Sequence, residues 1–210
     1  MTLALDHSIT AVLVVDPYND FVSEGGKFWD GLREVAEKVN CVPNMVRVLD
    51  GARSAGLQVF YVPHHRWRPR DYDGWKYWSP IQRRNEKEHI FAEGTWGGTF
   101  REEFTPLQGE TVVQQHWCSS GFANTDLDLE LKKHGIHRVI IIGLIANTCI
   151  EATVRYAAEL GYEATLIKDA TAAFSWEAMS AAIEINLPNY AESIITTEDV
   201  LQQLSAQTPA

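Results

Sequence analysis

The stretch RVIIIGLIANTCIEATVRYAAELGY, residues 138–162, contains a complete transition from strand to helix. Residues 138–144 are β-branched and almost continuously apolar, which predicts a strand buried on both faces, as in a parallel sheet. Residues 148–161 have the amphipathic pattern of a helix and end at Gly161, a usual C-terminal stop. The single cysteine of this stretch, Cys149, therefore lies where a buried strand gives way to a helix.

Strand-like and helix-like segments alternate along the rest of the chain. Apolar runs that predict strands recur at 10–16, 57–63, 111–116, 163–169 and 193–197, and amphipathic segments lie at 32–56, 123–135 and 175–187. This alternation predicts right-handed βαβ crossovers and a doubly wound α/β fold with a mostly parallel sheet of about six strands. The sequence contains neither GxGxxG nor GxxxxGK[ST], so it lacks the phosphate loops of familiar nucleotide-binding folds.

Length and composition narrow the class of protein. The 210 residues predict a single domain over residues 1–210, and the net charge of −10 argues against a nucleic-acid partner. No apolar stretch reaches the roughly 18 residues of a membrane span, and the N-terminus does not resemble a secretory signal. The three cysteines form no CxxC pair. We therefore expect reduced thiols, a cytoplasmic location and no membrane partner.

Residues 64–110 interrupt the alternation with a long connection rich in Trp, Arg, Gly and Pro. Long structured connections in compact domains are usually functional or used for assembly. Two interpretations stand side by side: a lid or pocket wall inserted over an active site, and a subunit contact, since Trp and Arg are enriched at interfaces.

The residues that follow the predicted strands are the first candidates for a site, because ligands of open α/β sheets bind beyond the carboxyl ends of the strands. Asp16 follows the first strand and precedes Pro17; it is either a functional carboxylate or a turn residue. His116 follows the third strand, where a packed histidine is the alternative. The adjacent pair His64 and His65 is not expected to bind a metal, because neighbours on an extended chain point to opposite faces.

Cys149 has the most specific local pattern. Thr148 and Glu151 match a capping box, which predicts that Thr148 caps the helix and that Cys149 is its first residue. The unpaired N–H groups there would lower the pKa of the thiol and stabilise an oxyanion. The alternative is a packed core cysteine, since free cysteine is among the most buried residue types. A nucleophile would also need a base, for which Asp16 and His116 are the candidates.

Three segments together resemble the isochorismatase-like cysteine hydrolase family: TAVLVVDPYNDF (10–21), GLIANTCIEATVRYAAELGY (143–162) and KDATAAFS (168–175). The resemblance extends over about residues 8 to 200. It implies a three-layer, Rossmann-like α/β/α sandwich, assembly as a homodimer or homotetramer, and hydrolysis of a small amide, carbamoyl or ureide compound. Members include isochorismatases, nicotinamidases and N-carbamoylsarcosine amidases.

The resemblance also implies roles for individual residues. Cys149 would be the nucleophile and Asp16 the general base. The peptide bond between Ile145 and Ala146 matches the place of a frequent cis bond, and the amides near Ala146 and Cys149 would form the oxyanion hole. These roles agree with the position of Cys149 at a strand end.

The third catalytic residue departs from the family pattern, which has a lysine after the third strand. One alignment of this chain puts His116 there and another puts Gln114, and the sequence has no lysine between Lys87 and Lys132. The segment between the first two strands also lacks the histidine-containing motif of the nicotinamidase metal site. We therefore predict no metal and no cofactor.

The leading hypothesis is a cysteine hydrolase that cleaves a C–N bond of a small molecule through a thioester at Cys149. An aromatic pocket is predicted from four residues, Phe21, Trp96, Trp117 and Phe122. One alternative is isochorismatase-type vinyl-ether hydrolysis by Asp16 with Cys149 as a bystander. Another is a non-catalytic protein that binds a small ligand or serves assembly, since the family lysine is missing.

Overall fold

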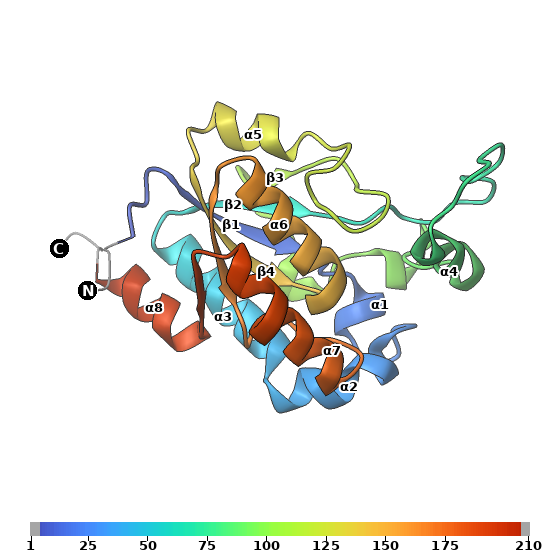
Figure 1. Ribbon diagram of the computed structural model, residues 1–210, viewed down its shortest axis with the longest axis horizontal. Coiled ribbons are helices and arrows are strands. Elements are labelled where there is room, and N and C mark those ends of the chain that lie inside the picture. The colour runs from blue at the N-terminus through green and yellow to red at the C-terminus, as the bar shows by residue number, and fades with distance from the viewer. Residues whose placement is uncertain (1–4, 207–210) are drawn as a thin grey trace.

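The computed structural model describes residues 5–206, which are built around a central six-stranded sheet (Figure 1). The strands are β1 (Thr10–Val15), β2 (Gln58–Val62), β3 (Thr111–Val112), β4 (Arg138–Gly143), β5 (Glu163–Ile167) and β6 (Ser193–Ile195). All neighbours are parallel, in the order β3-β2-β1-β4-β5-β6. The predicted doubly wound α/β fold is confirmed, and the two most apolar runs form the two central strands.

Helices cover both faces of the sheet. They are α1 (Asn19–Val22), α2 (Trp29–Lys38), α3 (Cys41–Ser54), α4 (Pro80–Glu88), α5 (Leu127–Lys133), α6 (Glu151–Glu159), α7 (Trp176–Ser180) and α8 (Thr197–Ser205). The α3 and α8 helices pack together on one face, and right-handed crossovers carry α5, α6 and α7 to the other (Figure 1). Within residues 5–206, no helix combines the length and the apolar character that crossing a membrane requires.

Two predicted elements differ from the structure. The helix expected over 32–56 is divided, because Asn40 takes the left-handed conformation (φ 58°) between α2 and α3. The strand expected over 111–116 is reduced to Thr111–Val112, because the Gln114 amide donates to the Asp126 carboxylate at 2.7 Å. The chain rejoins the sheet at one parallel bridge between His64 and His116.

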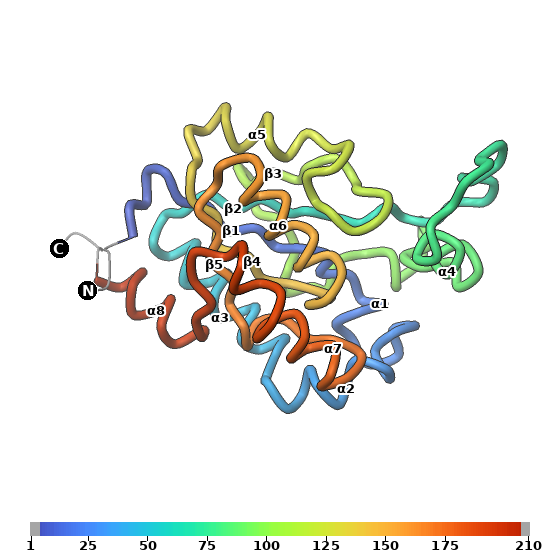
Figure 2. The backbone as a smooth tube through the Cα atoms, viewed as in Figure 1, coloured from blue at the N-terminus to red at the C-terminus, as the bar shows by residue number. Residues whose placement is uncertain are grey.

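The connecting segment 64–110 runs from the end of β2 to β3. It contains α4 and two short 3-10 turns, η1 (Trp96–Gly98) and η2 (Glu102–Phe104). Figure 2 shows that its part between β2 and α4 extends away from the sheet as an arm. Aromatic rings hold this arm together. The ring centroids of Tyr72 and Trp78 lie 4.7 Å apart, and those of Trp75 and Trp117 lie 5.4 Å apart.

Candidate active site

The candidate site lies where the strand order reverses, at the carboxyl ends of β1 and β4. Doubly wound sheets leave a crevice at this point, since the crossovers on either side go to opposite faces. Gly143 makes the close approach of the two chains possible: a Cβ there would lie 2.1 Å from the Val15 carbonyl oxygen. The next amide, that of Leu144, donates to the same oxygen at 3.2 Å.

Asp16 is the first residue after β1, and its side chain is fully buried. Its backbone is in the left-handed region with φ 52°, which costs an L-residue on the order of 1–2 kcal/mol. The conformation is held by two backbone hydrogen bonds, from the Asp16 amide to the Val62 carbonyl (3.2 Å) and from the Tyr18 amide to the Asp16 carbonyl (2.8 Å). The strand end thus turns sharply and directs a carboxylate into the interior.

Asp16, His116 and Cys149 converge. His116 Nε2 donates to Asp16 Oδ1 at 3.1 Å, and both side chains are fully buried. One potential ligand atom from each of the three residues lies within 4.8 Å of the other two. Asp16 Oδ2 and His116 Nδ1 are buried without a hydrogen-bond partner among residues 5–206. The structure therefore brings His116 beside Asp16 and Cys149, while Gln114 is exposed.

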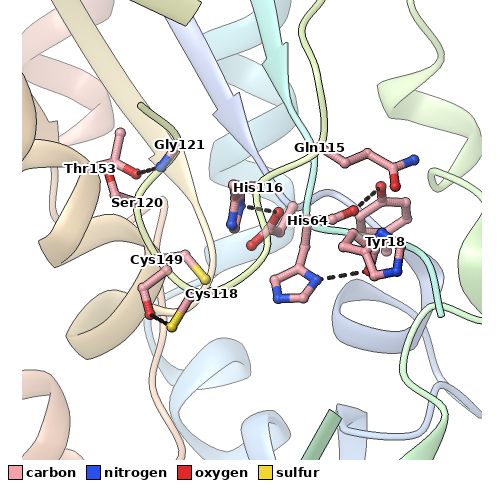
Figure 3. Close-up of polar contacts among 12 residues, drawn as sticks. Tyr18, His64, Gln115, His116, Cys118, Ser120, Gly121, Cys149 and Thr153 are labelled. Carbon is pink, nitrogen blue, oxygen red and sulfur yellow. Dashed lines mark hydrogen bonds and ion pairs between the residues drawn. The ribbon is translucent and has the colours of Figure 1, made fainter. Parts of the chain in front are cut away.

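The backbone of the β3 edge delivers His116 to this position. Its amide donates to the Pro63 carbonyl at 3.0 Å, and its carbonyl accepts from the His65 amide at 2.8 Å. The imidazole consequently lies beside that of His64, with ring centroids 5.0 Å apart (Figure 3). His116 is thus fixed by the sheet even though the strand assigned to this region ends at Val112.

His64 is a site residue for which the sequence suggested no role beyond the unlikely metal pair. Its Nδ1–H donates to the His65 carbonyl at 2.8 Å, because a carbonyl can only accept, and its Nε2 accepts from Asn85 Nδ2 at 3.1 Å. Burial, with a contribution from His116, lowers the pKa of His64 to about 4. His64 is therefore neutral near pH 7.

The environment of Cys149 differs from the prediction. Burial raises the pKa of the Cys149 thiol well above its ordinary value, and the charge and hydrogen bonding of Asp16 raise it further. Hydrogen bonds with the Thr148 side chain and the Ile145 backbone lower the pKa, but their effects are smaller. The resting state of Cys149 is accordingly a thiol. The direction is opposite to the lowered pKa expected from a helix N-terminus, because desolvation by burial is the largest influence on the thiol.

The predicted capping box is also wrong. Cys149 lies inside a π-helical turn, η3 (Ala146–Ile150), which precedes α6, and the N-terminal residue of that turn has no side-chain cap. Glu151 does not reach back to Thr148, because its carboxylate accepts from Arg155 at 2.6 Å and from Asn186 at 3.1 Å. The ion pair with Arg155, one turn along the same helix, and the hydrogen bond from the distant Asn186 thus take the place of the expected cap.

The loop before Cys149 requires two corrections. The cis peptide bond joins Leu144 and Ile145, one residue earlier than the family resemblance implied. The Ala146 amide donates to the Ala172 carbonyl at 2.8 Å, so this amide is already used and cannot serve as the predicted oxyanion donor. The cause is that the loop continues the pairing beside β5, where the Gly143 amide also donates to the Ala170 carbonyl.

A cavity of about 130 Å³ opens onto Cys149. Its lining combines residues from the 145–149 turn with His64, Phe21 and Phe174, and with residues of the connecting segment that include Arg84 and Asn85. Larger hollows lie elsewhere, one of them at the amino ends of the strands beside Thr10 and Arg138. The smaller cavity is the candidate site because Cys149 lines it.

Of the four predicted pocket residues, Phe21 lines this cavity and three do not. Trp96 is 55 % exposed. Its backbone carbonyl accepts a hydrogen bond from Asn19 Nδ2, so the backbone of Trp96 contacts the protein while much of the residue stays accessible. Trp117 stacks on His65 and lines a neighbouring hollow. Phe122 packs with Tyr162, 5.6 Å between centroids. Arg84 and Asn85 were not identified from the sequence, where the only signal was the unusual length and composition of the connecting segment.

Asp16, His116 and Cys149 form the one group of His, Cys, Asp and Glu residues in the described chain with a geometry that could hold a metal ion. Oxygen, nitrogen and sulfur donors are all acceptable to zinc. His64 and His65 do not form a metal pair, since His64 Nε2 bonds Asn85 and His65 Nε2 lies 2.7 Å from the Asp71 carboxylate.

Comparison with known proteins agrees with this architecture. The model of the isochorismatase domain matches residues 10–199. Ureidoacrylate amidohydrolase RutB of Agrobacterium fabrum is 29 % identical, with 99 % of this chain and 95 % of the relative covered. The RutB protein of Yersinia enterocolitica is 31 % identical, with 80 % and 77 % covered. The crystal structure of a cysteine hydrolase from Pseudomonas syringae superposes with a TM-score of 0.80, at 23 % identity and with 97 % and 95 % covered.

Proposed function

Because the chain belongs to the isochorismatase family, we propose that it is a cysteine hydrolase that cleaves the C–N bond of a small amide, carbamoyl or ureide compound. The observation that carries the proposal is the buried convergence of Asp16, His116 and Cys149 within 4.8 Å. A thiol, a carboxylate with a free oxygen and an imidazole that orients it are the parts of an acyl-transfer site.

The first half of the proposed reaction forms a thioester. Asp16 takes the proton of the Cys149 thiol as the sulfur attacks the substrate carbonyl carbon, so no free thiolate has to exist at rest. This order suits a thiol whose pKa is raised by burial and by Asp16 itself. Asp16 then returns the proton to the leaving nitrogen as the C–N bond breaks, which releases an amine or ammonia.

The second half hydrolyses the thioester. Asp16 takes a proton from a water molecule, the resulting hydroxide attacks the thioester carbonyl, and the proton passes to the departing sulfur. His116 acts on Asp16 rather than on substrate: its Nε2–H occupies Oδ1 at 3.1 Å, while Oδ2 keeps no partner among the described residues. His116 is thus proposed to do part of what the family lysine does.

Two observations support a small C–N substrate. The cavity of about 130 Å³ has room for a few heavy atoms next to Cys149. The relatives in Agrobacterium fabrum and Yersinia enterocolitica carry the name ureidoacrylate amidohydrolase, and they match 99 % and 80 % of the chain. A ureido or carbamoyl compound is therefore the first substrate class to test.

The test is to incubate the enzyme with a panel of carbamoyl, ureido and simple amide compounds and to measure ammonia release. Turnover should fall at least about 10³-fold in Cys149→Ala, and a rapid quench should trap an acyl adduct on the Cys149 peptide. Retained turnover in Cys149→Ala would contradict the proposal and favour vinyl-ether-type chemistry at Asp16. Absence of turnover on the whole panel would favour the non-catalytic alternative.

A further inference from the structure

We propose that Arg84 is a substrate-binding residue and that the substrate carries a carboxylate which Arg84 recognises. This inference rests on the proposed function, since it concerns the substrate of the same site. Arg84 lies on α4 in the connecting segment, and it lines the cavity that contains Cys149.

Aromatic rings hold the guanidinium group of Arg84 from two sides. Its Cζ lies 4.8 Å from the ring centroid of Phe28 and 5.0 Å from that of Phe174. The two rings themselves are in edge contact, 5.8 Å between centroids, and Phe174 also lines the cavity. Such packing orients the guanidinium group, and because the Arg84 side chain is exposed, its N–H donors face solvent at the rim of the cavity.

The Arg84 guanidinium has no hydrogen-bond or ion-pair partner among the described residues, whereas three other arginines of the same segment pair with carboxylates. Arg68 pairs with Glu93 at 2.5 Å, Arg70 with Asp73 at 2.6 Å and Arg101 with Glu103 at 2.9 Å. No described carboxylate or carbonyl plays that part for Arg84. Arg84 therefore lies at the cavity with donors that only solvent occupies, and a carboxylate on an incoming ligand can replace that solvent.

The charge of the cavity supports the same conclusion. Arg84 is the only Arg, Lys, Asp or Glu in its lining, and the one histidine there, His64, is neutral near pH 7. The guanidinium fork matches a carboxylate in a bidentate arrangement. The alternative role is purely structural, in which Arg84 only holds α4 against Phe28 and Phe174.

The experiment compares two ligands that differ in one charge, N-carbamoylglycine and its neutral amide, N-carbamoylglycinamide. Their affinities are measured by calorimetry on Cys149→Ala protein, so that no turnover is needed. We expect the anion to bind about 10- to 100-fold more tightly, as for a charge-assisted hydrogen bond at a partly exposed site, and the preference to shrink with added salt. Arg84→Met, which keeps the apolar stem, should remove most of this preference, and Arg84→Lys should retain part of it.

Arg83→Met is the matched control, since Arg83 is the neighbouring residue, bonds the Trp78 carbonyl at 2.6 Å and does not line the cavity. A preference for the anion below about 3-fold, or one that survives Arg84→Met, overturns the inference, and circular dichroism verifies that each variant is folded. The proposed function is judged separately by turnover in protein that retains Cys149. Arg84-dependent binding without turnover would contradict the hydrolase and leave the carboxylate site standing.

Discussion

The edge of the sheet and the connecting segment 64–110 contribute to one site in opposite ways. Asp16 and His116 are fully buried and are positioned by backbone hydrogen bonds to the ends of neighbouring strands. The connecting segment instead exposes large side chains, with Tyr77 89 % and Trp75 41 % accessible, and it lines the cavity with residues of α4 and with the residues that follow this helix. The comparison indicates that the rigid edge carries the proposed chemistry, whereas the exposed segment carries the selection of the substrate.

The largest effect should follow from removing the carboxylate at the rigid edge. Asp16→Asn should lower hydrolysis about 10³-fold, because the proton of Cys149 loses its acceptor. The same change should speed alkylation of Cys149 by iodoacetamide near pH 8. The reason is that the Asp16 charge raises the pKa of the thiol, so its removal lowers that pKa and increases the thiolate fraction.

Alkylation is measured against pH by mass spectrometry of the Cys149 peptide. A Cys118→Ser background serves as the control, because Cys118 is exposed and would consume reagent, whereas Cys41 is buried. Parallel losses of hydrolysis and of alkylation would mean that Asp16 supports the fold around Cys149 rather than acting as its base.

A second test compares the stability of the two regions. Ile141 in the central strand β4 is fully buried, with 0 % of its surface accessible. Ile141→Ala should therefore lower the free energy of unfolding by about 2–5 kcal/mol. Tyr77→Ser in the arm should change it by less than about 0.5 kcal/mol. Urea titrations provide both values. A large loss from Tyr77→Ser would show that the arm is part of the core, and the contrast between the regions would fail.

A third test concerns the residue that stands at the family's lysine position. His116→Ala should lower hydrolysis about 10²-fold, because Asp16 Oδ1 loses the hydrogen bond from His116 Nε2 that orients the carboxylate. His116→Lys should stay within about 10-fold of the wild type, since an ammonium group can also donate to the carboxylate. His116→Gln, a donor without charge, separates hydrogen bonding from charge. If all three variants match the wild type, His116 is structural only.

The two central strands were predictable because their residues are almost uniformly apolar over the length of an element. Asp16 and Cys149 were identifiable as candidates because they follow those strands at the expected edge of the sheet. The capping box at Thr148 and Glu151 was not, because Glu151 pairs with Arg155 and Asn186 instead. The raised pKa of Cys149 was not predictable either, because its largest cause is burial. Burial is a property of the whole fold, and a local pattern does not contain it.

The sequence by itself determined the doubly wound sheet and the two strand ends that carry Asp16 and Cys149, because hydrophobic periodicity and punctuation by polar residues are local properties. Only the tertiary structure placed His116, and not Gln114, beside Asp16, since that placement depends on one backbone bridge to His64 after the strand has ended. It also decided that Arg84, 65 positions before Cys149 in the chain, lines the same cavity. Contacts between distant segments follow from how the layers pack.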